Sequence, residues 1–462
     1  MKIFPTIVLF LLAASTWAQD ENTGDGPGSD RNRRTLSELS GRAAGIAAYT
    51  NVSLIDGTGA PVRKAASIVV DGERISAILG KDEPLPENAK VVDGTGWYAI
   101  PGLIDSHVHL ATLPANDIAR QHLRRSLYSG VTVVRDMAGD TRNLADLSRA
   151  ARINEIESPD IYYSALMAGP SFFSDPRTRV AALGEVPGQV PWMQAITGET
   201  DLALAVALAR GTGASGIKIY ADLSGDLVRN IITEASRQGI PVWTHQRIFP
   251  ATPFDPVEGG AVSVSHPCMI ASYALQPDTS SYGSEIPPDY SRASVDDPVV
   301  QRYFKAMVEH GTILDPTLSI FPEDAGDSPP PFLCPMKLAA ALTRAAHEAG
   351  VRIVAGTDSI SDPDDPFPRL FGEIELLVEK AGLSPVEALQ AASINGAAIL
   401  GLEGSMGTLE PGKLANIMFL SSNPESDVGA IKSVVLTLKR GNAFHRSDYR
   451  HETIPRVPFP QS

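Results

Sequence analysis

Four short stretches of the sequence repeat one pattern, in which a glycine stands directly before an apolar run. They are Gly130-Val-Thr-Val133, Gly239-Ile-Pro-Val242, Gly311-Thr-Ile-Leu314 and Gly350-Val-Arg-Ile353. Glycine accepts the left-handed conformation that often ends a helix, so each stretch predicts a helix followed at once by a strand. Before the last stretch, apolar residues recur at the spacing of one buried helix face. Those residues are Leu338, Leu342, Ala345 and Ala349.

Strands and helices alternate in this way over residues 99–400, which predicts an α/β fold with a parallel sheet. Eight strand-like runs over about 300 residues favour a closed (β/α)8 TIM barrel. A doubly wound open sheet is the alternative, but no Gly-x-Gly-x-x-Gly motif follows an early strand. The eight runs begin near Ala99, Val131, Ile161, Ile217, Val242, Val262, Ile313 and Arg352.

Both flanks of the barrel region have β-type patterns. Short runs separated by Asp-Gly turns fill residues 44–98, and two further runs follow within residues 401–445. We expect these two segments to form one small β-sandwich domain. Residues 446–462 are expected to form a loose tail.

The first residues predict export. Lys2 precedes an apolar stretch, and Ala18 ends a small-residue cleavage site, so residues 1–18 are expected to be a signal peptide. The stretch is too short to span a membrane and no later segment is apolar enough, so we expect no membrane anchor. Residues 19–43 are polar and predict a disordered linker. The expected location is the periplasm or the extracellular medium.

The charge of the chain excludes one class of function. With 39 Lys and Arg against 54 Asp and Glu, the net charge is −15. No basic stripe is present, so nucleic acid is not an expected partner. Two cysteines, Cys268 and Cys334, cannot build a disulfide framework, and Cys268 is expected to be a buried, unreactive thiol.

Histidines gather where chemistry takes place in a barrel, at the carboxyl ends of the strands. Four of the nine histidines end predicted strands, and a lysine and an aspartate join them. Side chains alternate along a strand, so the two histidines of the first strand face the same side. Imidazole and carboxylate ligands suit a divalent metal such as Zn²⁺. The set comprises His107, His109, Lys218, His245, His266 and Asp358.

Lys218 has three interpretations. If the flanking Ile217 and Ile219 face the helices, Lys218 and Tyr220 face the barrel interior. Burial beside cations lowers a lysine pKa, and a neutral amine can add CO2 to become a carbamate that bridges two metals. The alternatives are an ion pair with an aspartate and a Schiff-base lysine, as in barrel aldolases. The histidine set favours the metal interpretation.

Six segments together resemble the amidohydrolase superfamily, in particular its imidazolonepropionase-like and prolidase-like branch with Xaa-Pro and Xaa-Arg dipeptidase types. The resemblance covers about residues 45–440 and implies a barrel with a β-sandwich built from both flanks. The segments are Ile100-Pro-Gly-Leu-Ile-Asp-Ser-His-Val-His109, Ile217-Lys-Ile219, Thr244-His245, Ser265-His266, Gly356-Thr-Asp358 and Gly407-Thr-Leu-Glu-Pro-Gly-Lys413.

The resemblance implies a role for each residue of the set. His107 and His109 would bind the more buried of two divalent metal ions, expected to be Zn²⁺. The other two histidines would bind the second ion. Lys218, carboxylated by CO2, would bridge the ions, and Asp358 would be a ligand and the general base for a metal-bridging hydroxide. Lys218 and Asp358 are thus the expected catalytic residues.

One absence refines the expected reaction. Deaminases and imidazolonepropionases of the superfamily typically carry His-x-x-Glu, whereas Ile248 stands at that spacing from His245. Together with Lys218, this favours two-metal cleavage of an amide in a dipeptide or N-acyl amino acid. The alternatives are a lactone or ester hydrolase, a single-metal cyclic amidine or imidazolone hydrolase, and a non-catalytic binding scaffold.

Three residues are candidates for substrate binding. Tyr220 could donate to a developing oxyanion, and Arg177 or Arg247 could bind a carboxylate. Each also has a plain structural interpretation, as packing or as a surface ion pair. A small molecule or short peptide is the expected partner, and a homo-oligomer is left open.

Overall fold

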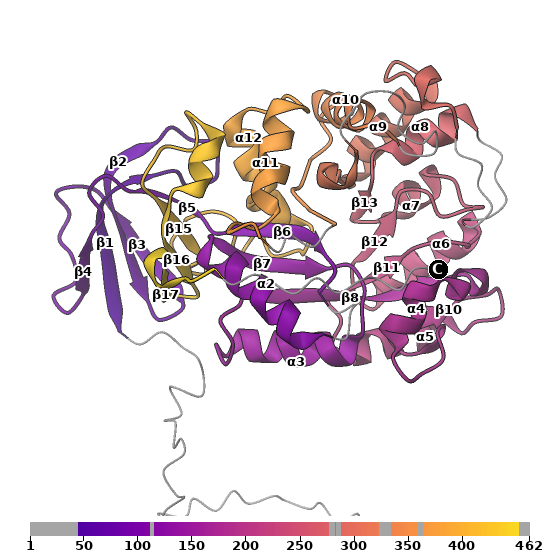
Figure 1. Cartoon of the computed structure of the whole chain (residues 1–462), viewed down its shortest axis with the longest axis horizontal. Helices are drawn as coiled ribbons and strands as arrows, with labels where there is room; N and C mark the ends of the chain where they lie inside the picture. The colour runs from indigo at the N-terminus through magenta and orange to yellow at the C-terminus, as the bar shows by residue number, and fades with distance from the viewer. Residues whose placement is uncertain are drawn as a thin grey trace, which may run out of the picture.

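The computed structural model describes residues 45–110, 115–276, 282, 288–322, 334–358 and 364–451. Two β-sheets form its framework, a parallel sheet covered by helices and a second, separate sheet (Figure 1). The expected signal peptide and linker lie outside the described residues. Within them, no helix is long and apolar enough to cross a membrane.

The strands of the parallel sheet follow one another in chain order, each hydrogen-bonded to the next. Segment 352–358 bonds on both sides: Val354 N donates to Leu314 O, and Asp358 N donates to His107 O. The sheet is therefore a nearly closed barrel, without the reversal of strand order that a doubly wound sheet requires. Its strands are β6 (Leu103–Val108), β7 (Val131–Asp136), β8 (Asp160–Ala168), β11 (Gly216–Ile219), β12 (Val242–His245), β13 (Ser263–Ser265) and β14 (Ile313–Asp315), with β9 (Gln189–Val190) and β10 (Met193–Ala195) added beside β8.

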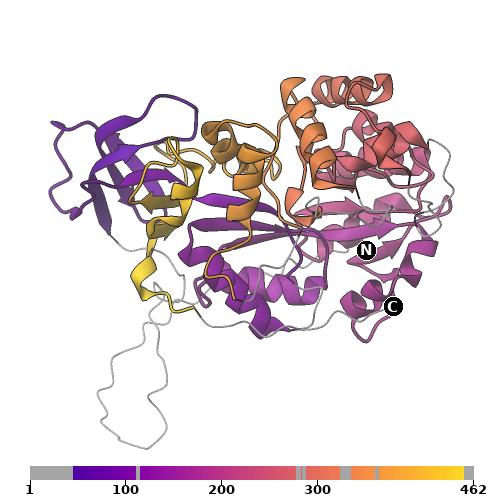
Figure 2. The same cartoon turned by 45° about the horizontal axis from the view of Figure 1, so that its top comes forward.

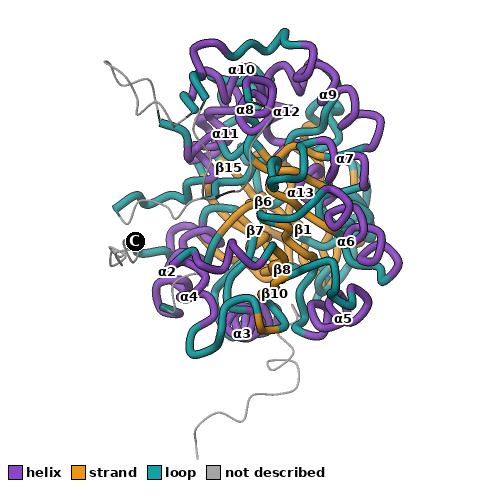
Figure 3. The backbone as a smooth tube through the Cα atoms, turned by 90° about the vertical axis from the view of Figure 1, so that its right-hand side faces the viewer, coloured by secondary structure: helices purple, strands orange, loops and turns teal. Residues whose placement is uncertain are grey.

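Helices surround these strands (Figure 3). The four glycines of the repeated pattern all have positive φ, between 68° and 94°, and each follows a helix and precedes a strand or an extended segment, as predicted. The helices are α2 (Asn116–Tyr128), α3 (Thr141–Arg152), α4 (Pro176–Ala182), α5 (Leu202–Gly211), α6 (Gly225–Arg237), α7 (Phe254–Gly259), α8 (Cys268–Leu275), α9 (Pro298–His310), α10 (Met336–Glu348), α11 (Leu370–Glu379), α12 (Pro385–Ala391) and α13 (Ile394–Ala398).

The first barrel strand begins later than the sequence predicts. Ala99 lies in β5 (Tyr98–Pro101), which pairs with strands of the second sheet, and β6 starts at Leu103. Gly102 separates the two strands, and a Cβ atom there would stand 2.4 Å from Thr132. The expectation of a barrel strand from Ala99 was wrong because one apolar run supplies strands to both sheets, and only the Pro-Gly bend divides it.

The second sheet combines both flanks of the barrel region, visible as indigo and yellow strands at the left of Figure 1 and from another side in Figure 2. Its order is β17-β16-β15-β5-β1-β2-β3, with β4 beside β1. By hydrogen bonding it is one continuous sheet, not the two of a sandwich, because β15 pairs with β5 edge to edge. The remaining strands are β1 (Ile46–Leu54), β2 (Arg63–Asp71), β3 (Arg74–Leu79), β4 (Lys90–Asp93), β15 (Ile417–Leu420), β16 (Val434–Lys439) and β17 (Asn442–His445).

Cys268 and Cys334 form a disulfide, with Cα atoms 6.2 Å apart. The expectation of a free thiol at Cys268 was therefore wrong. The two cysteines are separated by 66 positions in the sequence, and only the fold brings them within the distance that a disulfide requires. The bond joins the start of α8, two residues after His266, to the residues just before α10.

Replacing Cys334 by serine should lower the stability of the protein. The disulfide restricts the unfolded chain, so we expect the free energy of unfolding to fall by about 2–4 kcal/mol. Urea unfolding followed by circular dichroism measures this loss. A dithiol should lower the midpoint of the wild type and leave Cys334→Ser unchanged. Equal midpoints for the two proteins without reductant would contradict the prediction.

Candidate metal centre

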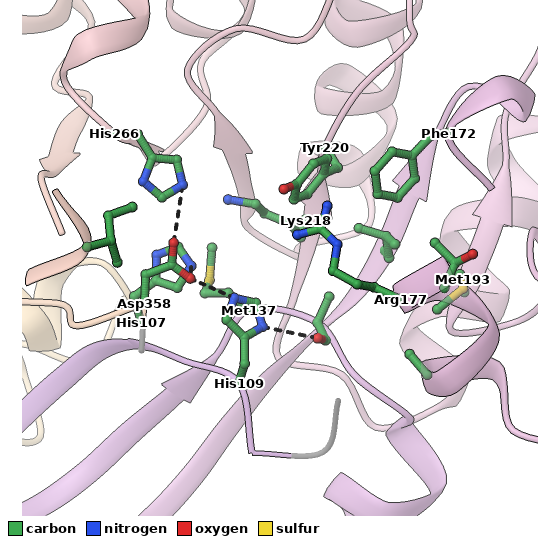
Figure 4. A pocket seen from close by; sticks show the side chains of 15 residues that line it. His107, His109, Met137, Phe172, Arg177, Met193, Lys218, Tyr220, His266 and Asp358 are labelled. Carbon is green, nitrogen blue, oxygen red and sulfur yellow. Dashed lines mark hydrogen bonds and ion pairs between the residues drawn. The ribbon is translucent and has the colours of Figure 1, made fainter. Parts of the chain in front are cut away.

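The two histidines of the first barrel strand meet one carboxylate. His107 lies in β6 and His109 just past its end, and their Nε2 atoms lie 3.2 Å and 2.9 Å from Oδ1 of Asp358. Asp358 belongs to the segment that closes the sheet next to β6. The structure thus brings these three predicted site residues together (Figure 4).

Two further histidines approach from neighbouring strands. His245 ends β12, His266 follows β13 directly, and their ring centroids lie 4.8 Å apart. Nε2 of His266 lies 3.6 Å from Oδ2 of Asp358. His266 and Asp358 both have left-handed backbone angles, with φ of 74° and 45°. Residues other than glycine adopt this conformation rarely, and such strained positions cluster at functional sites.

Each of the four imidazoles has its Nδ1 atom in contact with a polar atom of the surrounding protein. Such a contact fixes the orientation of the ring and leaves Nε2 to face the centre, as is usual for histidine ligands of metals. The contacts are Asp315 Oδ2 for His107 (2.7 Å), Ala138 O for His109 (3.4 Å), Arg247 O for His245 (3.0 Å) and Thr317 Oγ1 for His266 (2.8 Å).

Lys218 enters the site from β11, between two fully buried isoleucines. Its side chain lines the same cavity, and no described residue forms a hydrogen bond with its Nζ atom. The described residues thus provide no hydrogen-bonded aspartate partner for it. Burial, reinforced by the positive charge of Arg135, lowers the pKa of Lys218 to about 7. Buried polar atoms are normally satisfied, so an unpaired amine points to a ligand or a modification at this atom.

The charges around Asp358 stabilise one another. Burial alone would raise the pKa of Asp358, yet the imidazoles, led by His107, hold it well below its usual range. Burial would lower the pKa of His107, but Asp358 and Asp315 outweigh it and raise that pKa. For His245 and His266 burial dominates: the pKa of His245 falls to about 3, and that of His266 lies well below its ordinary value. Histidine binds a metal ion through a neutral ring, so the lowered pKa values of His245 and His266 and the ionised carboxylate of Asp358 favour binding of a cation.

These residues fit a divalent metal ion. Among the described residues, His107, His266 and Asp358 each offer a ligand atom, and these atoms lie within 4.8 Å of one another. Imidazole nitrogen and carboxylate oxygen are ligands that Zn²⁺ takes in proteins. The unpaired Nζ of Lys218 lies in the wall of the same cavity and could supply a further ligand.

The centre opens into a cavity of about 560 Å³, a volume that suits a small organic ligand. Tyr220 stacks on His245 with 4.9 Å between ring centroids. Arg177 also lines the cavity, where it pairs with Asp175 at 2.6 Å and lies 6.0 Å from the ring of Tyr220. The rest of the wall is largely apolar, with Met137, Leu166, Phe172, Ala181, Met193 and Ile320.

Arg247 is not among the residues that line this cavity. Its guanidinium donates to Ser272 Oγ and to Gln276 O, at 2.6 Å and 2.8 Å, and lies 4.3 Å from the ring centroid of Phe249. Its backbone oxygen faces Nδ1 of His245. The side chain therefore stabilises the segment after β12 and does not stand where the sequence analysis expected a substrate-binding arginine.

One residue of the site was missed in the sequence. Asp315 ends β14 and contacts His107, so the strand-end rule that found His245 would also have found it. Phe172 lies in the long loop 171–177 after the third barrel strand, which the sequence marks as a segment that could set the substrate, but the sequence does not single out this residue. Phe172 reaches the cavity from a short 3-10 helix, η1 (Pro170–Ser174), whose position depends on the packing of the loop after β8.

Residues 297–443 match the model of the amidohydrolase family. This part of the chain is therefore similar to an amidohydrolase family domain, in agreement with the resemblance inferred from the sequence motifs.

Relatives and solved structures agree with this class. An ochratoxinase from Aspergillus niger is 26% identical over 447 residues, which cover 85% of this chain and 85% of the relative. An imidazolonepropionase from Rubrobacter xylanophilus is 25% identical over 378 residues, 77% of this chain and 85% of the relative. The crystal structure of a Xaa-Pro dipeptidase with bound methionine has a TM-score of 0.68 at 22% identity and covers 87% of this chain and 100% of its own. That last similarity shows a shared fold.

In metal-free protein, thermal stability should depend on pH through His107. Its pKa is raised by folding, so the protonated ring stabilises the fold below about pH 6.5, and this contribution is lost as the pH rises through the raised pKa. We expect the Tm of the wild type to exceed that of His107→Asn most at about pH 6 and less at about pH 9. Thermal unfolding with a chelator present measures the difference, and a difference that grows with pH would contradict the prediction.

Proposed function

We propose that this protein is a binuclear metal-dependent amidohydrolase that cleaves the amide bond of a dipeptide or an N-acyl amino acid. One observation carries the proposal: His107, His109, His266, the carboxylate of Asp358 and the unpaired amine of Lys218 line a single cavity. The ring of His245 lies behind them, 4.8 Å from that of His266 between centroids. The family match and the relatives support the class. A closed (β/α)8 barrel is part of the proposal, supported by the bonds of segment 352–358 to both neighbouring strands.

The residues of the centre would hold two divalent ions, which we propose to be Zn²⁺. When bound, the ions would supply Lewis-acid activation of a water molecule and of the scissile carbonyl. His107 and His109 would hold one ion and His245 and His266 the other, with Asp358 as a further ligand. Lys218 would bridge them as a carbamate formed with CO2. Its lowered pKa supports this role, because only the neutral amine adds CO2.

Residues of the chain would then move the proton and hold the substrate. Asp358 is held ionised, so its Oδ2 atom can accept a proton from the attacking water and return it to the leaving nitrogen. Burial raises the pKa of Tyr220 well above its ordinary value, so its hydroxyl keeps the proton that it would donate to the developing oxyanion. Arg177 would bind a carboxylate of the substrate.

A single-metal imidazolone hydrolase is the second candidate, because one relative is an imidazolonepropionase. The residue three positions after His245 argues against it. Ile248 is fully buried and apolar, and it cannot serve as the acid that such enzymes typically carry there. Esters and lactones could react with the same activated water, so they belong in any substrate screen.

We also propose that the protein is exported, to the periplasm or beyond it. The signal-like N-terminus motivates this, and the disulfide supports it, because disulfides persist in oxidising compartments and are rare in the reducing cytosol.

Protein prepared with Zn²⁺ and bicarbonate should contain about two divalent ions per chain. It should release amino acids from a library of dipeptides and N-acyl amino acids, and a chelator should abolish the activity until zinc is restored. Elemental analysis and an assay for released amines measure both. Protein that binds no metal under these conditions refutes the metal centre, and cleavage of esters or lactones alone refutes amide hydrolysis.

Lys218→Ala should lower kcat/KM by about 100-fold or more, because the centre loses its bridging group. Steady-state kinetics on the best amide substrate measures the effect. Lys305→Ala, which removes an exposed lysine of α9, is the matched control and should retain activity. A Schiff-base lysine would instead give borohydride trapping of the substrate on Lys218 and activity that survives chelators.

A further inference from the structure

A buried ion pair crosses the interior of the parallel sheet beside the metal centre. Arg135 of β7 and Asp315 of β14 are both fully buried, and Nη2 of the arginine donates to Oδ2 of the aspartate at 3.0 Å. Other nitrogens of the same guanidinium donate to Ser106 O and to Ser263 Oγ. One side chain of β7 thus contacts β6, β13 and β14.

Trp243 of β12 fixes the same guanidinium from a further direction. The Cζ atom of Arg135 lies 4.7 Å from the centroid of the indole ring. The indole is itself held, because its nitrogen donates to Ile399 O at 3.0 Å. A planar group with directed donors that also stacks on a ring has little freedom to turn. The position of the Asp315 carboxylate is therefore set by strands other than its own.

Asp315 transmits this fixed position to His107. Its Oδ2 atom accepts from Nδ1 of His107 at 2.7 Å and from Ser265 Oγ at 3.2 Å, besides Arg135. An ionised carboxylate only accepts hydrogen bonds, so the proton of the shortest contact belongs on Nδ1. Gly356 packs over the other oxygen, where a Cβ atom would stand 2.4 Å from Oδ1.

We propose that Asp315 and Arg135 are positioning residues of the centre. They hold His107 with a proton on Nδ1 and with the lone pair of Nε2 directed at the metal ion. The carboxylate also raises the basicity of the ring as a ligand. This inference rests on the proposed metal site, but neither residue is one of the proposed ligands or cavity-lining residues.

The test uses Asp315→Asn, Asp315→Ala and Arg135→Lys in two measurements. The first is zinc affinity, by competition with a chromophoric chelator. Asparagine keeps an acceptor but loses the charge, so we expect about tenfold weaker binding, and about 100-fold for alanine. Arg135→Lys keeps the positive charge but loses the planar guanidinium with its several directed N–H donors, so we expect zinc to bind about tenfold more weakly.

The second measurement needs no metal. NMR of protein with ¹⁵N-labelled histidine follows the Nδ1–H proton of His107. Bonded to a buried carboxylate, this proton should exchange slowly with solvent in the metal-free wild type. The chemical shift of this proton should change in Asp315→Asn, and in Asp315→Ala the proton should exchange rapidly with solvent. If Asp315 contributed only to packing, its variants would lower stability. The effect on the His107 proton would then not be larger for alanine, which lacks the acceptor, than for asparagine, which lacks only the charge.

Asp160→Asn is the matched control. Asp160 is also a buried carboxylate paired with an arginine, Arg440, but it begins β8, at the end opposite to the site. Its loss should lower stability and leave zinc affinity and the His107 signal unchanged.

The outcomes separate the inference from the function on which it rests. Asp315 variants with wild-type zinc affinity and a wild-type His107 signal would overturn it. If the wild type binds no zinc, the metal centre fails, and the NMR signal alone decides whether Asp315 positions the ring. If Asp315→Ala does not fold, Asp315→Asn, which is nearly the same size, carries the comparison.

Discussion

The site depends on the backbone hydrogen bonds that close the parallel sheet. Asp358 N donates to His107 O at 2.8 Å, and Ser106 N donates to Ala355 O at 2.9 Å. These bonds join the last segment of the ring to its first strand, although the two are far apart in the sequence. Because main-chain bonds set this contact, the carboxylate of Asp358 faces the imidazoles even before any metal ion is considered.

Closure of the sheet also buries polar groups. These must form hydrogen bonds with one another, because burying a polar group without a partner costs free energy. Asp105 is an example: it accepts from His107 N, from Thr357 N and from Thr357 Oγ1, at 3.2, 3.1 and 3.0 Å. Burial still raises the pKa of Asp105 to about 7. The network links β6 to the closing segment.

The sequence predicts the site better than its surroundings, for a geometric reason. Parallel strands bring their carboxyl ends to one edge, so reactive residue types at strand ends can be recognised without knowing how the helices pack. His245, His266 and Asp358 were found in this way and lie together in the structure. Asp315 satisfies the same rule and was overlooked.

Features set by loops or by side-chain direction could not be found by that rule. Arg247 follows a strand end, yet its side chain turns toward Ser272, and only the packing of α8 determines this. The disulfide joins the start of α8 to the segment before α10, and no spacing in the sequence reveals that these approach each other. The boundary between β5 and β6 was missed because periodicity reports that a run is apolar and extended, not which sheet it enters.

That boundary has a consequence for how the protein is made. β5 pairs with β15, and Gly102 alone separates β5 from the first barrel strand. A ribosome delivers β5 long before β15, so one edge of the early strands stays open while the whole barrel is synthesised. Exposed strand edges pair readily with other chains. The nascent chain therefore has an unpaired, aggregation-prone strand edge until β15 is synthesised. A chain truncated before β15 would keep this edge unpaired permanently.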